Sequence, residues 1–136
     1  MKNSKKAFKN VQFFSSPVQA GFPSPADDFI DKRLDLNEHL VKHPAATFFV
    51  RVIGDSMKGA GIIEGDILVV DKAKPVSNNA IVIAYLDGEF TVKRVGKRGE
   101  KIYLLPENPN FKPIEVNAEH NFEVWGVVTY VIHKIE

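Results

Sequence analysis

Two residue types in this sequence could together carry out acyl transfer: a serine near glycines and a lysine further along. Ser56 lies in residues 54–57 (GDSM), after an apolar run and before the glycine-rich residues 58–61 (KGAG). A serine exposed on such a turn can act as a nucleophile, and free backbone N–H groups there can stabilise an oxyanion. A serine that merely serves the turn, or caps the next element, gives the same local pattern.

Lys93 can act as the base for Ser56 only if it is buried. In residues 89–95 (EFTVKRV), the alternation of a strand places Glu89, Thr91, Lys93 and Val95 on one face and Phe90, Val92 and Arg94 on the other. Burial among apolar groups lowers the pKa of a lysine, and only the neutral amine accepts a proton. A strand lysine is more commonly exposed to solvent, and the alternation alone does not decide between the two.

The histidines offer a competing base or a set of metal ligands, but their spacing supports neither. They are His39, His43, His120 and His133. His39 and His43 can share a helix face, yet Pro44 follows directly and no carboxylate completes a site, so we expect helix-end or surface roles. The chain has no cysteine, which excludes disulfides, thiolate metal sites and a cysteine nucleophile. We expect no metal and no cofactor.

Length and charge favour a single domain without a nucleic-acid-binding field. The chain has 136 residues, and 18 basic against 17 acidic side chains give a formal net charge of +1. The lysines among the first ten residues fit a solvated terminus. Residues 18–20 (VQA) have the pattern of a signal-peptidase site, but the apolar run before them is too short for a signal peptide, and no run is long enough to span a membrane. We expect a cytoplasmic protein.

The elements that must position Ser56 and Lys93 are mostly strands. Residues 15–28 hold three prolines and should be extended and accessible, so we expect residues 1–30 to form a flexible arm and residues 31–136 to form the folded domain. A short helix should begin at Asp35, with Glu38 completing a capping box, and end before Pro44.

Six strands are expected after this helix, with an Asp87-Gly88 hairpin turn between the third and the fourth. Four aromatic side chains in these strands should pack in the core: Phe48, Phe49, Phe122 and Trp125. The expected strands cover residues 47–53, 66–71, 80–86, 89–95, 101–105 and 122–133.

Four runs in the same order resemble the LexA/UmuD family of self-cleaving serine peptidases, and the resemblance covers nearly all of the chain from about residue 15. The separation of 37 residues between Ser56 and Lys93 agrees with the pattern of that family. The resemblance implies a mostly β fold of twisted antiparallel sheets with one short helix and a flexible N-terminal arm. The runs are residues 54–57 (GDSM), 65–71 (GDILVVD), 87–94 (DGEFTVKR) and 104–114 (LLPENPNFKPI).

The resemblance also assigns a role to each site residue. Ser56 matches the nucleophile, and Lys93 matches the general base that is kept neutral in the folded site. The backbone N–H groups of Ser56 and Asp55 would form the oxyanion hole. Ala20-Gly21 matches the pair at which the family cuts its own N-terminal arm, which would make this chain an autocatalytic serine endopeptidase.

Only 20 residues precede Gly21, too few for the helix-turn-helix domain of the repressors in the family, so the resemblance is to its UmuD-type members. It implies a homodimer of the SOS response to DNA damage. A RecA filament on single-stranded DNA would stimulate the cut, and the product would join the Y-family polymerase subunit UmuC in a translesion DNA polymerase of the polymerase V type. Direct sequence-specific DNA binding and a membrane are not expected. A non-catalytic, dimeric, polymerase-binding or regulatory module is the alternative.

Overall fold

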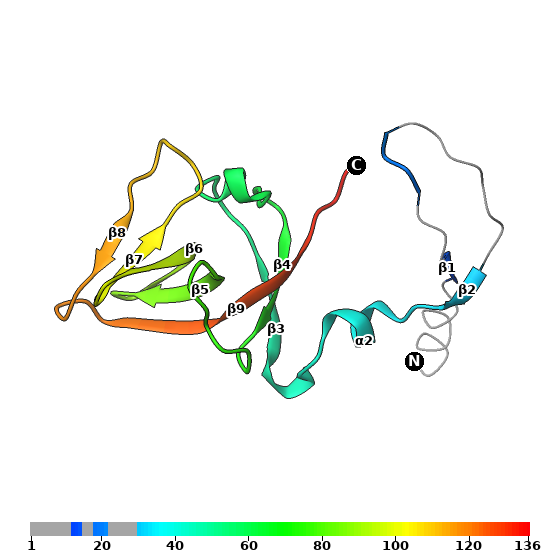
Figure 1. Cartoon of the computed structure of the whole chain (residues 1–136), viewed down its shortest axis with the longest axis horizontal. Helices are drawn as coiled ribbons and strands as arrows, with labels where there is room; N and C mark the ends of the chain where they lie inside the picture. Colours follow the sequence, from blue (N-terminus) through cyan, green and yellow to red (C-terminus); the bar gives the residue numbers. More distant parts are fainter. Residues whose placement is uncertain (1–11, 15–17, 22–29) are drawn as a thin grey trace. The chain divides into compact units, whose positions relative to one another are not determined.

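The computed structural model describes residues 12–14, 18–21 and 30–136, which fall into two units, Met1–His39 and Leu40–Glu136 (Figure 1). In the first unit, β1 (Gln12–Phe14) pairs antiparallel with β2 (Ile30–Arg33). Neither short strand was predicted, and β1 falls within the expected arm. Most of that arm lies outside the described residues.

The expected short helix is confirmed as α2 (Leu36–Leu40). Asp35 caps its start as predicted, because the Asn37 N–H donates to Asp35 Oδ1 at 3.0 Å, whereas within the described residues the structure gives no bond from Glu38 that would complete the expected capping box. Pro44, which has no N–H to donate, begins the 3₁₀ helix η1 (Pro44–Ala46) that leads into the sheet.

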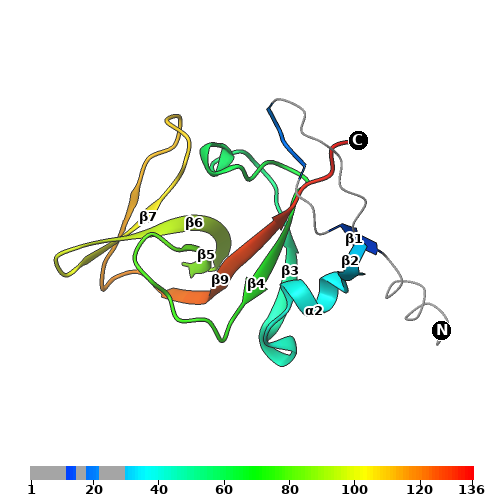
Figure 2. The ribbon, with the colours of Figure 1, turned by 45° about the vertical axis from the view of Figure 1, so that its right-hand side comes forward.

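The second unit is built on one antiparallel sheet of seven strands in the order β3-β4-β9-β5-β6-β7-β8 (Figures 1 and 2). Although β9 is the last strand in the sequence, it lies between β4 and β5 and joins the two halves of the sheet. The strands are β3 (Thr47–Arg51), β4 (Ile67–Asp71), β5 (Ile81–Leu86), β6 (Glu89–Arg98), β7 (Lys101–Leu105), β8 (Ile114–Val116) and β9 (Phe122–Ile132).

The six predicted strands are confirmed with small changes at their ends, and β8 is the strand of this sheet that was missed. β6 continues to Arg98, three residues beyond its predicted end. The two-residue hairpin turn is also confirmed, with φ of 49° at Asp87 and 93° at Gly88. This tight turn aligns β5 with β6 and so fixes the position of Lys93 opposite Val82.

Both faces of β5 are buried, which explains its nearly continuous apolar sequence. Ile83 belongs to one core cluster, whereas Val82 and Ala84 belong to a second. The first cluster holds Val52, Met57, Ile62, Leu68, Val70 and Ile83. The second holds Val82, Ala84, Val95, Leu104 and Val127.

The prediction of core packing is right for Phe48 and Phe122 but wrong for Phe49 and Trp125. Strand alternation turns Phe49 and Trp125 outward, and they are 56% and 37% exposed. The Trp125 ring instead meets the edge of Phe90, with ring centroids 4.9 Å apart, and the Lys72 ammonium lies 4.8 Å from its centroid.

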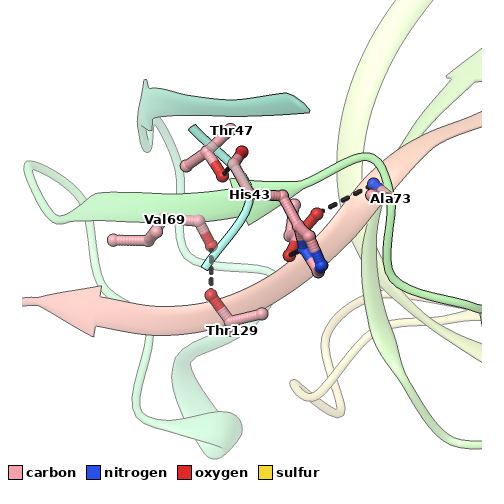
Figure 3. Close-up of polar contacts among 6 residues, drawn as sticks. His43, Thr47, Val69, Ala73 and Thr129 are labelled. Atoms are coloured by element: carbon pink, nitrogen blue, oxygen red, sulfur yellow. Dashed lines mark hydrogen bonds and ion pairs between the residues drawn. The ribbon is translucent and has the colours of Figure 1, made fainter. Parts of the chain in front are cut away.

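Three histidines are paired with aspartates. In Figure 3, His43 lies beside the turn after β4. Its Nδ1 is 2.6 Å from Asp71 Oδ2, and the Ala73 N–H donates to Asp71 Oδ1 at 2.8 Å. Figure 3 also shows Thr129 of β9, which donates to the Val69 carbonyl at 3.3 Å. The other pairs are His120 with Asp87 and His133 with Asp66, each at 2.7 Å. Among the described residues, no three or more His, Cys, Asp or Glu side chains are grouped so that they could hold a metal ion.

Candidate active site

Ser56 lies on the loop between β3 and β4, on the sharp turn that its glycines predicted. Gly54, with φ of 87°, reverses the chain two residues before it. Met57 is 1% exposed and anchors the loop in the first core cluster. The 3₁₀ helix η2 (Lys58–Ala60) then turns the chain away from the site. The Ser56 side chain is therefore held half-buried beside the sheet.

The loop that follows β7 is hydrogen-bonded to the loop that carries Ser56, the serine loop. The Glu107 N–H donates to the Ser56 carbonyl at 2.8 Å, and the Gly59 N–H donates to the Glu107 carbonyl at 2.7 Å. Asn108 Nδ2 donates to the Asp55 carbonyl at 2.9 Å. These three bonds fix the backbone on both sides of Ser56.

Lys93 reaches Ser56 from β6. Its Nζ lies 3.0 Å from Ser56 Oγ, 2.6 Å from Thr91 Oγ1 and 3.1 Å from the Val92 carbonyl oxygen. Thr91 is two residues away on the same strand face, as the alternation predicted. The structure thus brings the predicted serine and lysine into hydrogen-bonding contact.

The surroundings of Lys93 favour a neutral amine. The residue is only 9% exposed, and its cross-strand partner is the fully buried Val82. Burial lowers the pKa of Lys93 below its ordinary value, because an ammonium loses hydration there. Its three hydrogen-bonding partners are uncharged oxygens. None of them is a carboxylate that would raise the pKa of Lys93 again. Lys93 is therefore buried, a point that the strand alternation alone could not decide.

A mostly apolar pocket of about 260 Å³ opens next to the Ser56 side chain. Most of its lining comes from the end of β3 with the residues after it and from β6. β3 is at the edge of the sheet, where an extended peptide can add as a further strand. The pocket is lined by Val50, Arg51, Val52, Ile53, Ser56, Leu68, Ile83, Phe90, Thr91 and Val92.

The backbone N–H groups of Asp55 and Ser56 make no hydrogen bond within the described part of the chain, whereas the carbonyls of both residues are bonded. Free amides beside a nucleophile can bind an oxyanion. The two residues expected to supply that hole therefore have donors to spare.

Ala20 and Gly21, the predicted scissile pair, belong to the first unit and are both exposed. Val18, two residues before Ala20, is 92% exposed. These residues lie outside any regular element, as a segment must if it is to enter a protease cleft in an extended form.

Comparison with known proteins decides the family. Residues 12–129 match the family described as Peptidase S24-like, a stretch that contains Ser56 and Lys93. The chain belongs to the peptidase S24-like family. This membership supports the serine peptidase class, and it confirms the resemblance to the LexA/UmuD peptidases that the sequence motifs carry.

Three known proteins match this chain along most of their length. Protein SamA of Salmonella typhimurium strain LT2 is 50% identical over 121 residues, covering 89% of this chain and 84% of SamA. Protein ImpA of Escherichia coli is 46% identical over 127 residues, covering 89% and 82%. Protein MucA of Escherichia coli is 41% identical over 122 residues, covering 89% and 83%.

Sequence reasoning missed the residues that support the pair. Thr91 was placed on the face of Lys93 but given no task, although a hydroxyl two positions away on a strand is within reach of a lysine. Glu107 and Asn108 were noted only as part of the run 104–114 that resembles the family. Their contacts with the serine loop span about fifty positions, and no local pattern signals a contact at that separation.

In the part of the chain that the structure describes, no helix combines the length and the apolar character needed to cross a membrane.

Proposed function

We propose that this chain is a self-cleaving serine endopeptidase in which Ser56 and Lys93 cut the Ala20–Gly21 bond. The observation that carries the proposal is the 3.0 Å distance between a buried Lys93 Nζ and Ser56 Oγ. A lysine kept neutral by burial is a base strong enough to take the proton of a serine hydroxyl.

The hydrogen bonds around Lys93 suit this proton transfer. A neutral amine has two N–H bonds and one lone pair. The N–H bonds can be donated to Thr91 Oγ1 and the Val92 carbonyl, which leaves the lone pair to accept the Ser56 hydroxyl proton. Thr91 and Val92 thus orient the base toward Ser56.

The reaction follows from these positions. Ser56 Oγ attacks the Ala20 carbonyl carbon while its proton passes to Lys93 Nζ, and the N–H groups of Ser56 and Asp55 stabilise the oxyanion. The Gly21 nitrogen leaves with the proton from Lys93, and an ester forms between Ala20 and Ser56. Water, deprotonated by Lys93, then hydrolyses the ester, releasing the Ala20 carboxylate and restoring the serine.

A tethered substrate explains how so simple a site can work. We expect the segment around Val18–Gly21 to add as a strand beside the pocket, at the β3 edge. Tethering makes the attack unimolecular and supplies much of the rate. If the segment docks rarely, a partner that stabilises the docked state controls the cut.

The family suggests the setting of this reaction, SOS mutagenesis. In this proposal a RecA filament on single-stranded DNA stimulates the cut in the cytoplasm. The product, residues 21–136, acts as a homodimer and as the accessory subunit of a Y-family polymerase, UmuC, in error-prone translesion synthesis.

Intact mass spectrometry tests the peptidase. The purified protein, incubated at mildly alkaline pH, should yield a fragment that begins at Gly21, whereas Ser56→Ala and Lys93→Ala should remain whole. The RecA filament should accelerate the cut in the native chain only. Cleavage that persists in Ser56→Ala would contradict the proposal, as would a native chain that stays whole even with the filament present. The latter result would favour a non-catalytic binding module.

A further inference from the structure

Asn108 lies on a loop far from Ser56 in sequence, yet it holds the peptide group that bears the Ser56 N–H. Its Nδ2 donates to the Asp55 carbonyl at 2.9 Å. That carbonyl and the Ser56 N–H belong to one planar peptide unit, in which C=O and N–H point in opposite directions when the bond is trans. The Lys58 N–H also donates to the Asp55 carbonyl, at 3.1 Å, so two donors hold this peptide. Asn108 is the side-chain donor of the two, and by helping to fix the direction of the Asp55 carbonyl it also helps to fix the direction of the Ser56 N–H.

A second hydrogen bond sets the orientation of the Asn108 side chain. Its Oδ1 accepts the Asn110 N–H at 3.0 Å. With the oxygen committed to this turn, the NH₂ group must face the Asp55 carbonyl, so the amide cannot flip without losing both bonds. The loop after β7 thus presents a donor of fixed direction to the serine loop.

The residue before Asn108 anchors the same loop to the body of the domain. The Glu107 side chain pairs with Arg94 of β6, the neighbour of Lys93, and Arg94 Nη1 donates to the Asn79 carbonyl at 2.7 Å. The Glu107 backbone bonds both Ser56 and Gly59. The support behind Asn108 therefore extends to the strand that carries the lysine.

We propose that Asn108 is a positioning residue for the oxyanion hole, acting through the peptide between Asp55 and Ser56. This inference rests on the proposed function for its effect on rate. It assigns a task to the loop that neither the serine nor the lysine explains, which is to keep the Ser56 N–H directed at the reacting carbonyl oxygen before the substrate arrives.

Two substitutions isolate the lost donor. Asn108→Asp keeps the oxygen that accepts the Asn110 N–H, but it adds a charge and cannot donate to the Asp55 carbonyl. Asn108→Leu has a similar size and no charge, but it loses the turn bond as well. The loss of the donor to Asp55 is common to both variants, so an effect that they share reports on that bond.

Asn117 provides a matched control. Its Oδ1 accepts the Glu119 N–H at 3.0 Å in the same kind of turn, and the structure gives its side chain no bond to the serine loop. Asn117→Asp and Asn117→Leu therefore make the same chemical changes in a turn that does not hold Ser56. These controls should cleave at the native rate.

Self-cleavage is followed by intact mass across alkaline pH, beside native protein and Ser56→Ala. Both Asn108 variants should show a plateau rate about 10- to 100-fold below native. This effect is no larger than the loss of rate that follows when an oxyanion-hole donor is removed outright. The pH midpoint should be unchanged in Asn108→Leu, which adds no charge, because the contacts of Lys93 are intact. A shifted midpoint in Asn108→Leu would mean general damage to the site and would overturn the inference, as would native rates in both variants.

Amide NMR separates this inference from the proposed function. Spectra are recorded at mildly acidic pH, where cleavage should be slow, and the Ser56 amide resonance should move in both Asn108 variants but not in the Asn117 controls. If the native chain never cleaves, the proposed function fails, and the NMR result still judges the positioning. An unmoved Ser56 amide in both Asn108 variants overturns the inference.

Discussion

At the scale of single residues, Lys93 is where stability and chemistry conflict. An ammonium at this position loses most of its hydration, and none of its hydrogen-bonding partners is a carboxylate that could compensate for that loss. The lowered pKa means that protonating the folded state costs more than protonating the unfolded chain. The burial that would prepare Lys93 for its proposed role as a base therefore weakens the fold at neutral pH.

Replacing Lys93 with Met should stabilise the protein at neutral pH by about 1 kcal/mol, since a buried charge is exchanged for an apolar chain of similar length. In the native protein, the unfolded chain holds the proton up to about pH 10.4, whereas the folded chain releases it at lower pH. Stability of the native protein should therefore rise with pH across that window, and the advantage of Lys93→Met should shrink. Urea unfolding at neutral and alkaline pH measures both effects, and an advantage that grows with pH would contradict the argument.

Thr91 should tune the pH at which the base becomes active. Its Oγ1 accepts a hydrogen bond from Lys93 Nζ at 2.6 Å, and such a bond favours the charged amine. Thr91→Val should move the pH midpoint of self-cleavage downward and lower the plateau rate several-fold, because the amine is less well oriented. Thr129→Val, which removes a similar hydroxyl bond to the Val69 carbonyl, is the control. A midpoint that moves upward would exclude this role.

At the scale of elements, the contact between the serine loop and the loop after β7 depends on a glycine. A Cβ on Gly59 would come within 2.5 Å of the Glu107 carbonyl oxygen, which is backbone and cannot rotate away. A Cβ on Gly96 would meet Leu105 Cδ1 at 2.7 Å, the end of a flexible side chain. The two glycines therefore differ in what a methyl group would displace.

Gly59→Ala should separate the two loops, destabilise the protein by about 1–3 kcal/mol and slow self-cleavage, because overpacking moves the backbone that bears Ser56. Gly96→Ala should cost less, since Leu105 can change rotamer. Thermal unfolding and intact-mass kinetics on both variants test this. Equal effects on cleavage would show that the loop contact has no special part in the chemistry.

The elements were predictable where their signal is local. The Asp87-Gly88 turn, the capped start of α2 at Asp35 and the apolar runs of the longer strands follow from neighbouring residues. β8 was missed because it has only three residues and follows closely after Pro113.

The site was predictable in part. Ser56 and Lys93 were found by their motifs, and the resemblance supplied their pairing. The depth of Lys93 and the bonds from Glu107 and Asn108 depend on strands and loops that meet only in the folded sheet. Local patterns cannot report such contacts, because sequence distance says nothing about which strands become neighbours.

At the scale of the whole molecule, histidine–aspartate pairs join segments that are distant in sequence. Asp66, just before β4, accepts a hydrogen bond from the Ile63 N–H at 2.9 Å and pairs with His133, just beyond the end of β9. The Ile63 hydrogen bond, followed by that of His133, holds the pKa of Asp66 below its ordinary value even though burial opposes this. The carboxylate is only 2% exposed, so its partners bear most of its stabilisation.

Asp66→Asn should therefore reduce stability at neutral pH by about 1.5–3 kcal/mol, the contribution of hydrogen bonds to a charged group. The native advantage is present above the unfolded pKa, about 3.9, and should be lost as pH falls through the lower folded pKa. Asp87→Asn is the comparison, since that carboxylate is half exposed and should contribute less. Urea unfolding at neutral and acidic pH gives both differences, and a cost for Asp66→Asn that is unchanged in acid would contradict this account.

The strand order has a consequence for the timing of synthesis. Ser56 precedes β4 and Lys93 lies on β6, and β9 separates β4 from β5 and β6 in the sheet. On the ribosome, the segments that carry the serine and the lysine emerge well before the strand that holds their two halves together. A nascent chain therefore lacks the strand that joins the two halves of the sheet until residues 122–132 have left the exit tunnel. We therefore expect the contact between Ser56 and Lys93 to become stable only after β9 has been translated.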